Sequence, residues 1–236
     1  MGNAMQYKRV SVEEAIGWIK QGWELFKKEP GLLIVMTLIY FGISIAGSLV
    51  PLVGPIAVTL LSPALGAGFM YVARELEQDR PIEVGDLFQA FKQEGKINQF
   101  LILGAISLGI SIIGYLVMFG SMIGGMVSVS ATGGDPGPLF FIGITIAVLI
   151  FITMSFVMVM LLLYSVPLVM LDNVSAIDAI KSSFLACLKN IWPLTVLSAI
   201  LLIPIIIAII PFGLGMLVLA PILSMMVYAS YKNIYH

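Results

Sequence analysis

The sequence predicts an all-α membrane protein that crosses the bilayer six times. Of its 236 residues, 60% are hydrophobic and only 11% are charged, whereas a soluble domain carries roughly 25% charged residues. Six apolar runs approach or exceed the length of about 20 residues that a spanning helix needs. The lysines and arginines are confined to the segments between alternate runs, which is typical of a chain that crosses a membrane repeatedly.

The six runs define one transmembrane domain over residues 1–236. Proline and glycine in the links 51–55 and 211–215 stop one helix and permit the reversal into the next. At 1.5 Å per residue the third run would extend ~46 Å, against a hydrocarbon core of ~30 Å. The third and fourth helices are therefore expected to tilt, break or protrude. The predicted spans are residues 31–50, 52–73, 97–127, 139–171, 191–210 and 212–231.

The basic residues predict the orientation of the chain. All twelve precede the first span, follow the sixth, or lie between the second and third or the fourth and fifth spans. Because cytoplasmic loops carry an excess of lysine and arginine, this side is predicted to be the cytoplasm, with both termini inside. The twelve residues are Lys8, Arg9, Lys20, Lys27, Lys28, Arg74, Arg80, Lys92, Lys96, Lys181, Lys189 and Lys232.

The segment before the first span is predicted to be an amphipathic surface helix. Ser11 followed by Glu14 forms a capping box at its start. Apolar residues then recur at spacings of 4, 3, 4 and 3, which places them on one helical face. These residues are Val12, Ile16, Ile19, Trp23 and Phe26. Tryptophan is enriched at membrane interfaces, so the candidate interface residues are Ile16, Trp18, Ile19, Trp23 and Phe26.

The same arrangement is expected three times along the chain, as tandem units 11–77, 81–171 and 174–235, each a surface helix followed by a two-span hairpin. In each unit the closing helix has an interior proline: Pro63, Pro167 and Pro221. The surface helices either lie in the headgroup region or pack on the cytoplasmic floor of the spans. The apolar face of the second helix comprises Val84, Leu87, Phe88 and Phe91, and that of the third Ile177, Ile180, Phe184 and Leu188.

Residues that could catalyse a reaction, relay protons or bind a metal are scarce. The predicted spans contain no Asp, Glu, Lys, Arg or His, and such groups at membrane depth usually mark proton relays and ion pathways. The one histidine, His236, ends the chain, and the one cysteine is Cys187. The sequence has neither a phosphate-binding loop nor a cluster with zinc-ligand spacing. We therefore expect no catalytic site, no cofactor and no proton-coupled pump.

Two stripes of polar residues run along the first and third spans. Each stripe follows the spacing of one helical face. They either line a cavity for a neutral or amphiphilic ligand or serve close helix packing, in which small residues and hydroxyls are common. The candidate cavity-lining residues are Thr37, Tyr40, Ser44 and Ser48 on the first span, and Ser107, Ser111 and Tyr115 on the third.

The stripe on the third span continues into a ladder of methionines, Met118, Met122 and Met126. Thioethers are soft ligands that suit Cu(I), which makes the ladder a weak candidate metal path. Methionine is also an ordinary core residue, and no cysteine or histidine lies near it in the sequence to complete a site.

Four stretches resemble a family of uncharacterised bacterial six-span inner-membrane proteins with a domain of unknown function. They are "WIKQGWELFKKEP" (18–30), "ELEQDRPIEVGDLFQAF" (75–91), "PFGLGMLVLAP" (211–221) and "YASYKNIY" (228–235). They are distributed over nearly the whole chain. The resemblance implies a bacterial inner-membrane location, and it brings no catalytic residue with it.

These observations favour a non-enzymatic membrane protein that binds lipid, another membrane protein or a second copy of itself, as an assembly, scaffold or membrane-homeostasis factor. The surface helices favour this interpretation because apolar helix faces can lie in the headgroup boundary. The alternative is a transporter or channel for a neutral or amphiphilic solute. A weaker alternative is an accessory subunit of a respiratory or copper-handling complex. The sequence gives no indication of nucleic-acid binding, since the net charge is −1 and it has no basic tract.

Overall fold

The computed structural model describes residues 6–131, 133 and 137–236, and within these ranges the secondary structure is helical. Six of its helices are long and apolar enough to cross a membrane, as the sequence predicts. The elements are α1 (Val12–Lys28), α2 (Pro30–Ser48), α3 (Val53–Glu77), η1 (Val84–Phe88), α4 (Gln89–Lys92), α5 (Lys96–Ala131), α6 (Pro138–Leu162), α7 (Ser165–Asp172), α8 (Ala176–Lys189), α9 (Ile191–Ile209) and α10 (Met216–Tyr235).

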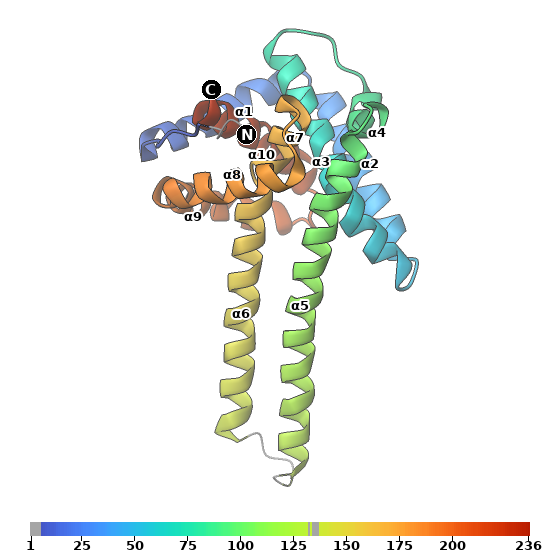
Figure 1. Cartoon of the computed structure of the whole chain (residues 1–236), viewed down its shortest axis with the longest axis vertical. Helices are drawn as coiled ribbons and strands as arrows, with labels where there is room; N and C mark the ends of the chain where they lie inside the picture. The colour runs from blue at the N-terminus through green and yellow to red at the C-terminus, as the bar shows by residue number, and fades with distance from the viewer. Residues whose placement is uncertain (1–5, 132, 134–136) are drawn as a thin grey trace.

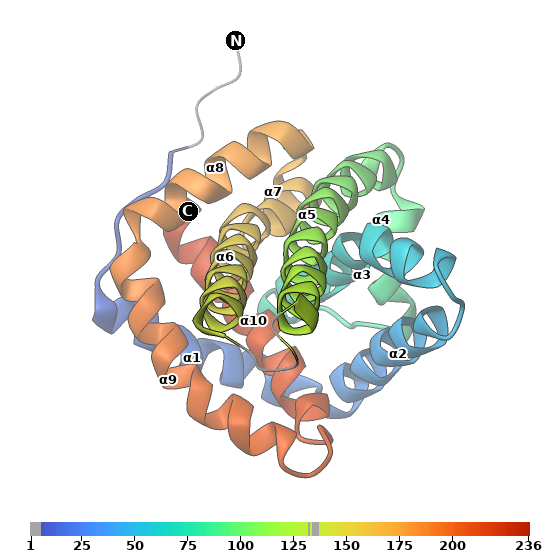
Figure 2. The ribbon, with the colours of Figure 1, turned by 90° about the horizontal axis from the view of Figure 1, so that it is seen from below.

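The long helices form three antiparallel pairs that extend from a shared end in different directions. α5 and α6 run along the long axis of the molecule (Figure 1). Seen along that pair, α9 and α10 lie across it, and α2 and α3 extend to another side (Figure 2). The candidate spans are thus splayed rather than gathered into one parallel bundle. α1, α4, α7 and α8 all lie at the shared end, together with the C-terminus (Figure 1).

The predicted fourth span is broken near its end. α6 ends at Leu162 and α7 begins at Ser165. In a continuous α-helix the N–H of Tyr164 would donate to the carbonyl of Met160. Instead the Ser183 hydroxyl of α8 lies between these groups, accepting from Tyr164 N at 3.0 Å and donating to Met160 O at 2.7 Å. The inserted hydroxyl pairs both backbone groups and lets α7 turn away.

The second surface helix differs from the prediction. Residues 84–92 form a short 3-10 segment, η1, followed by the single turn α4, rather than one amphipathic helix. The Asp86 carboxylate accepts the N–H of Glu83 at 2.8 Å, and Gly85 lowers the helix propensity. Leu87 is fully buried, whereas Phe91 remains exposed.

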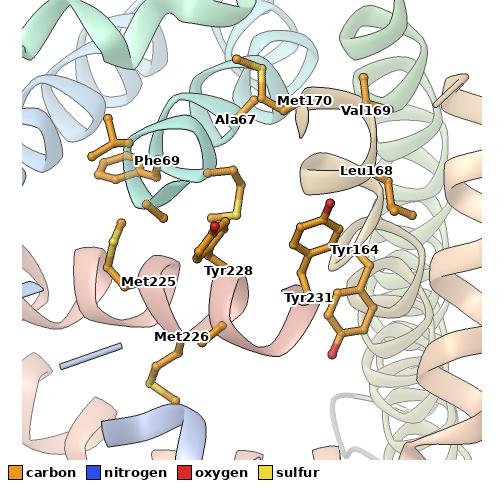
Figure 3. Packing of buried hydrophobic residues seen from close by; sticks show 14 of the residues in the cluster. Ala67, Phe69, Tyr164, Leu168, Val169, Met170, Met225, Met226, Tyr228 and Tyr231 are labelled. Atoms are coloured by element: carbon orange, nitrogen blue, oxygen red, sulfur yellow. The ribbon is translucent and has the colours of Figure 1, made fainter. Parts of the chain in front are cut away.

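The core lies at the shared end and is centred on α10. Figure 3 shows Met225 pointing toward Phe69 and α3, and Met226 pointing to the opposite side of α10, toward α1. Gly22 of α1 meets Met226 there: a Cβ at this glycine would lie 2.4 Å from Met226 Cγ. The backbones of α3 and α5 also approach closely where the two helices cross. A Cβ on Gly104 would lie 2.1 Å from the carbonyl oxygen of Leu60.

Candidate functional site

The C-terminal end of α10 holds the ends of α3 and α7 by polar contacts. The Tyr228 hydroxyl donates to Glu77 Oε2 at 2.7 Å, and Lys232 Nζ lies 2.7 Å from Glu77 Oε1. The Tyr231 hydroxyl donates to Asp172 Oδ2 at 2.6 Å. Glu77 ends α3 and Asp172 ends α7, so one helix fixes the other two.

The N-terminal segment is fixed to the same region by a buried asparagine. Asn190, at the α8–α9 junction, accepts from Val10 N at 2.8 Å and donates to Lys8 O at 3.0 Å. Lys8 N in turn donates to Ile234 O at 2.9 Å. The beginning and the end of the described chain are therefore directly hydrogen-bonded.

A polar hollow of about 770 Å³ lies between α1 and α10, next to Lys8 and the C-terminal His236. Its charged groups are of both signs: lysines and the terminal histidine face two glutamates, one of which, Glu77, is already paired with Lys232. This mixture does not select an anionic or a cationic ligand. The hollow is lined by Lys8, Gly17, Lys20, Gln21, Glu24, Leu25, Glu77, Tyr228, Ala229, Lys232, Asn233 and His236.

A second hollow of about 370 Å³, here called the apolar slot, lies on the other side of α10. Its walls come from α6, α9 and α10, with Trp18 of α1 and Cys187 of α8 at one end. Burial raises the pKa of the Cys187 thiol to about 12, so the group is a neutral thiol at physiological pH. The remaining lining residues are Phe156, Val159, Met160, Leu163, Ile191, Leu194, Thr195, Leu197, Ser198, Leu201, Leu202, Ile205, Leu223, Met226, Val227 and Ser230.

Trp18 is the unusual residue of the apolar slot. Its side chain is 1% exposed, and its buried Nε1 has no hydrogen-bond partner. A buried donor without a partner costs about 1–3 kcal/mol. The nearby hydroxyls of Thr195 and Ser198 instead donate to carbonyls one turn back on α9. Trp18 thus brings a buried, unpaired donor to a slot whose lining is mostly apolar.

The structure divides the five candidate interface residues of α1. Trp18 and Phe26 are buried, whereas Ile16 and Trp23 are 43% and 45% exposed; Ile19 lies in between. The face of α1 that packs on protein is rotated by roughly a quarter turn from the predicted apolar stripe, at 100° per residue. It consists of Ala15, Trp18, Gly22, Leu25 and Phe26.

The two polar stripes do not meet in one cavity, because α3 lies between α2 and α5 (Figure 2). Tyr40 packs edge-on against Phe69. Ser111 and Tyr115 line a small cavity of about 150 Å³ between α5 and α6. Four hydroxyls of the stripes donate to carbonyls four residues back on their own helices: Thr37, Ser44, Ser48 and Ser107.

The methionine ladder lies in the outer half of the α5–α6 pair. Met118 and Met122 line a cavity of about 320 Å³ with aromatic residues of both helices, and Met126 is exposed. Within the part of the chain that the structure describes, no group of three or more His, Cys, Asp or Glu could hold a metal ion.

Sequence reasoning missed three residues that organise this region: Ser183, Asn190 and the unpaired nitrogen of Trp18. The available signal for Asn190 was its place in the sequence, as an asparagine between a predicted surface helix and the fifth span. No local pattern indicates the role of Ser183, since its partners are on another helix.

Comparisons with known proteins match the chain to a family of unknown function and to a probable inner membrane protein. The family described as "Protein of unknown function (DUF975)" matches residues 20–236. A probable inner membrane protein of Burkholderia thailandensis is 26% identical over 202 residues, which cover 81% of this chain and 73% of that protein. No solved structure matches the chain.

Proposed function

The chain belongs to the DUF975 family of proteins of unknown function, and we propose that it is a non-catalytic scaffold of the bacterial inner membrane that binds lipid or a membrane-protein partner. The inner-membrane location agrees with the relative from Burkholderia thailandensis and with the six apolar helices. A partner would be another membrane protein or a second copy of this chain.

The observation that carries the proposal is the projecting α5–α6 pair. α5 has 36 residues and would extend about 54 Å at 1.5 Å per residue, well beyond a hydrocarbon core of ~30 Å. The far half of the pair has no other helix beside it (Figure 1). Its exposed residues are large and apolar, and where the pair extends beyond the hydrocarbon core such a patch would face water, which marks an interaction site. They include Leu116, Phe119, Ile123, Met126, Phe141, Ile142 and Ile146.

Transport has less support than scaffolding. A transporter in which the polar stripes form the pathway needs both stripes on one cavity. Here α3 separates them, and four of the hydroxyls are paired within their own helices. Hydroxyls paired in this way serve the helix itself.

We also propose that both termini are cytoplasmic and that the chain consists of three related units. The hydrogen bond between Lys8 N and Ile234 O supports the same side for both termini, and the excess of basic residues at that end supports the cytoplasm. Serine N-caps at Ser11 and Ser175, each bonded to the residue three positions on, support a relation between the first and third units.

The test is native mass spectrometry after extraction in a mild detergent. We expect the wild-type protein to retain lipid, a partner protein or a second copy. The double substitution Phe119→Ala and Ile123→Ala should reduce that retention, whereas Ile206→Ala and Ile207→Ala, at equally exposed positions of α9, should not. A wild-type protein that leaves the membrane as a bare monomer would refute the proposal.

A further inference from the structure

The apolar slot has the form of a binding site for one hydrocarbon chain. Its residues on α9 run from Ile191 to Ile205, a length of about 21 Å at 1.5 Å per residue. One leaflet of a ~30 Å hydrocarbon core is ~15 Å deep. The walls are helices that by length and composition are membrane spans, so the surrounding solvent is lipid.

The two ends of the slot differ chemically. Cys187, Ile191 and Ser230 lie at the end near α1 and α8, together with Trp18. Phe156, Ile205 and Leu223, farther along their helices from that end, complete the slot with apolar side chains. Trp18, whose Nε1 is unpaired, therefore belongs to the end of the slot formed by α8 and the C-terminal half of α10, where the polar part of a lipid would be held.

We propose that the apolar slot binds one acyl chain of a diester phospholipid, and that an ester carbonyl oxygen of the lipid accepts a hydrogen bond from Trp18 Nε1. The proposal rests on the proposed function and specifies its lipid ligand. An acyl chain matches the apolar walls, and an ester carbonyl is the acceptor that a phospholipid carries directly at the end of that chain. Met160 and Met226 also line the slot, and unbranched thioether chains adapt readily to an incoming group.

The splayed arrangement gives the slot its opening. α9 and α10 lie across the direction of α6 (Figures 1 and 2), so only the last two turns of α6, from Phe156 onward, reach the slot. A gap between splayed apolar helices cannot remain water-filled in a bilayer at low cost. A lipid chain is the component that is present at high concentration to fill it.

Different substitutions test the binding of the acyl chain and the binding of its ester group separately. Ser198→Phe places a large side chain in the slot, and Ile206→Phe places the same side chain on an exposed part of α9 outside it. Trp18→Phe keeps an aromatic wall and removes the donor. Native mass spectrometry would titrate each delipidated protein with dioleoyl phosphatidylethanolamine and with its diether analogue, which has no ester carbonyl.

We expect wild-type protein to bind the diester lipid about five- to tenfold more tightly than the diether, the effect of one hydrogen bond. Trp18→Phe should abolish this preference while keeping the binding of the acyl chain. Ser198→Phe should weaken the binding of both lipids at least tenfold relative to Ile206→Phe. Equal affinity in the two phenylalanine variants of α9 would overturn the slot as the site. An ester preference that survives Trp18→Phe would overturn the role of Nε1.

A second measurement avoids slot-filling variants that fail to fold. Trp18 becomes the sole tryptophan after Trp23→Phe and Trp192→Phe, since the chain has three. We expect its fluorescence to be quenched in vesicles of a phospholipid brominated close to the ester, relative to the unbrominated lipid. Unquenched fluorescence would overturn the proposal. The α5–α6 variants retain the slot, so the loss of a partner protein or second copy in those variants reports on the scaffold, whereas the lipid titration of the slot variants reports on this proposal alone.

Discussion

Asn190→Ala should release the N-terminal segment from the folded protein. Asn190 is completely buried and joins the α8–α9 junction to Val10 and Lys8. Its loss leaves the buried Val10 N–H without a partner, which costs about 1–3 kcal/mol, and removes a further neutral hydrogen bond to Lys8 O worth about 0.5–1.5 kcal/mol. The carbonyl oxygen of Ala186 is not left unpaired by the substitution, because it still accepts from the backbone N–H of residue 190 at 3.1 Å. The expected total is about 2–4 kcal/mol.

Hydrogen exchange at the amide of Val10 measures this change directly. At about 1.4 kcal/mol for each factor of ten, protection of this amide should fall roughly 30- to 700-fold. Trypsin should also cleave faster after Lys8 and Arg9, because two of the described hydrogen bonds that hold the segment are lost, while those from Lys8 N to Ile234 O at 2.9 Å and from Lys189 Nζ to Tyr7 O at 3.0 Å remain.

The control is Asn98→Ala, which removes an exposed asparagine and should leave the exchange of Val10 unchanged. If Asn190→Ala also leaves Val10 as protected as in the wild type, the buried asparagine does not hold the segment and the energetic reasoning is refuted. Unfolding of the whole protein would be recognised by loss of protection in α3 and α10 as well.

Three further outcomes are expected. Gly104→Ala should lower the melting temperature sharply, because its Cβ would meet the Leu60 carbonyl oxygen at 2.1 Å. The control Gly109→Ala, whose Cβ would meet nothing within 4 Å, should be neutral or stabilising by up to about 1 kcal/mol. Equal melting temperatures of the two variants would contradict the close crossing of α3 and α5. Hydrogen bonds from the N-cap Ser11 lower the pKa of Glu14 from 4.5, so the capping box is present above pH 4.5 and is lost as the pH falls through the lowered pKa. Amide hydrogen exchange in the first turn of α1 should accelerate over that pH range in the wild type. Glu14→Gln should show no such step. Cys187, whose pKa burial raises to about 12, should resist alkylation at pH 8 until the protein unfolds; rapid labelling of folded protein would contradict its burial.

Local sequence patterns predicted the start of the helix that precedes the first span, but not the face that it buries. The structure has both hydrogen bonds of the Ser11–Glu14 capping box, and the helix begins at Val12. The prediction selected the helical face with the most hydrophobic residues. The contact with α10 depends instead on Ala15 and Gly22, small residues that allow two backbones to approach closely.

The break between α6 and α7 and the position of the N-terminal segment could not be predicted from local patterns. The first depends on Ser183, whose hydroxyl comes from another helix. The second depends on Asn190, which lies 180 residues from Val10 in the chain. Polar groups that pair across such distances leave no periodic signal, whereas apolar length is a local property, and the six spans follow from it.

Burial and hydropathy along the spans are inversely related, which argues for a membrane independently of any relative. The stretch Phe140–Asp172 has the highest hydropathy, 2.9, yet only 11% of its most apolar part is buried inside the protein. The spans Val53–Glu77 and Met216–Tyr235 have hydropathies of 1.7 and 1.3, with 50% and 44% buried. In a soluble protein the most apolar helix would be the most buried, because water drives apolar surface inward. In lipid the outward faces have to be apolar, and polar groups are held where protein can pair them. α10, the least apolar span, accordingly carries the tyrosine and lysine contacts to Glu77 and Asp172.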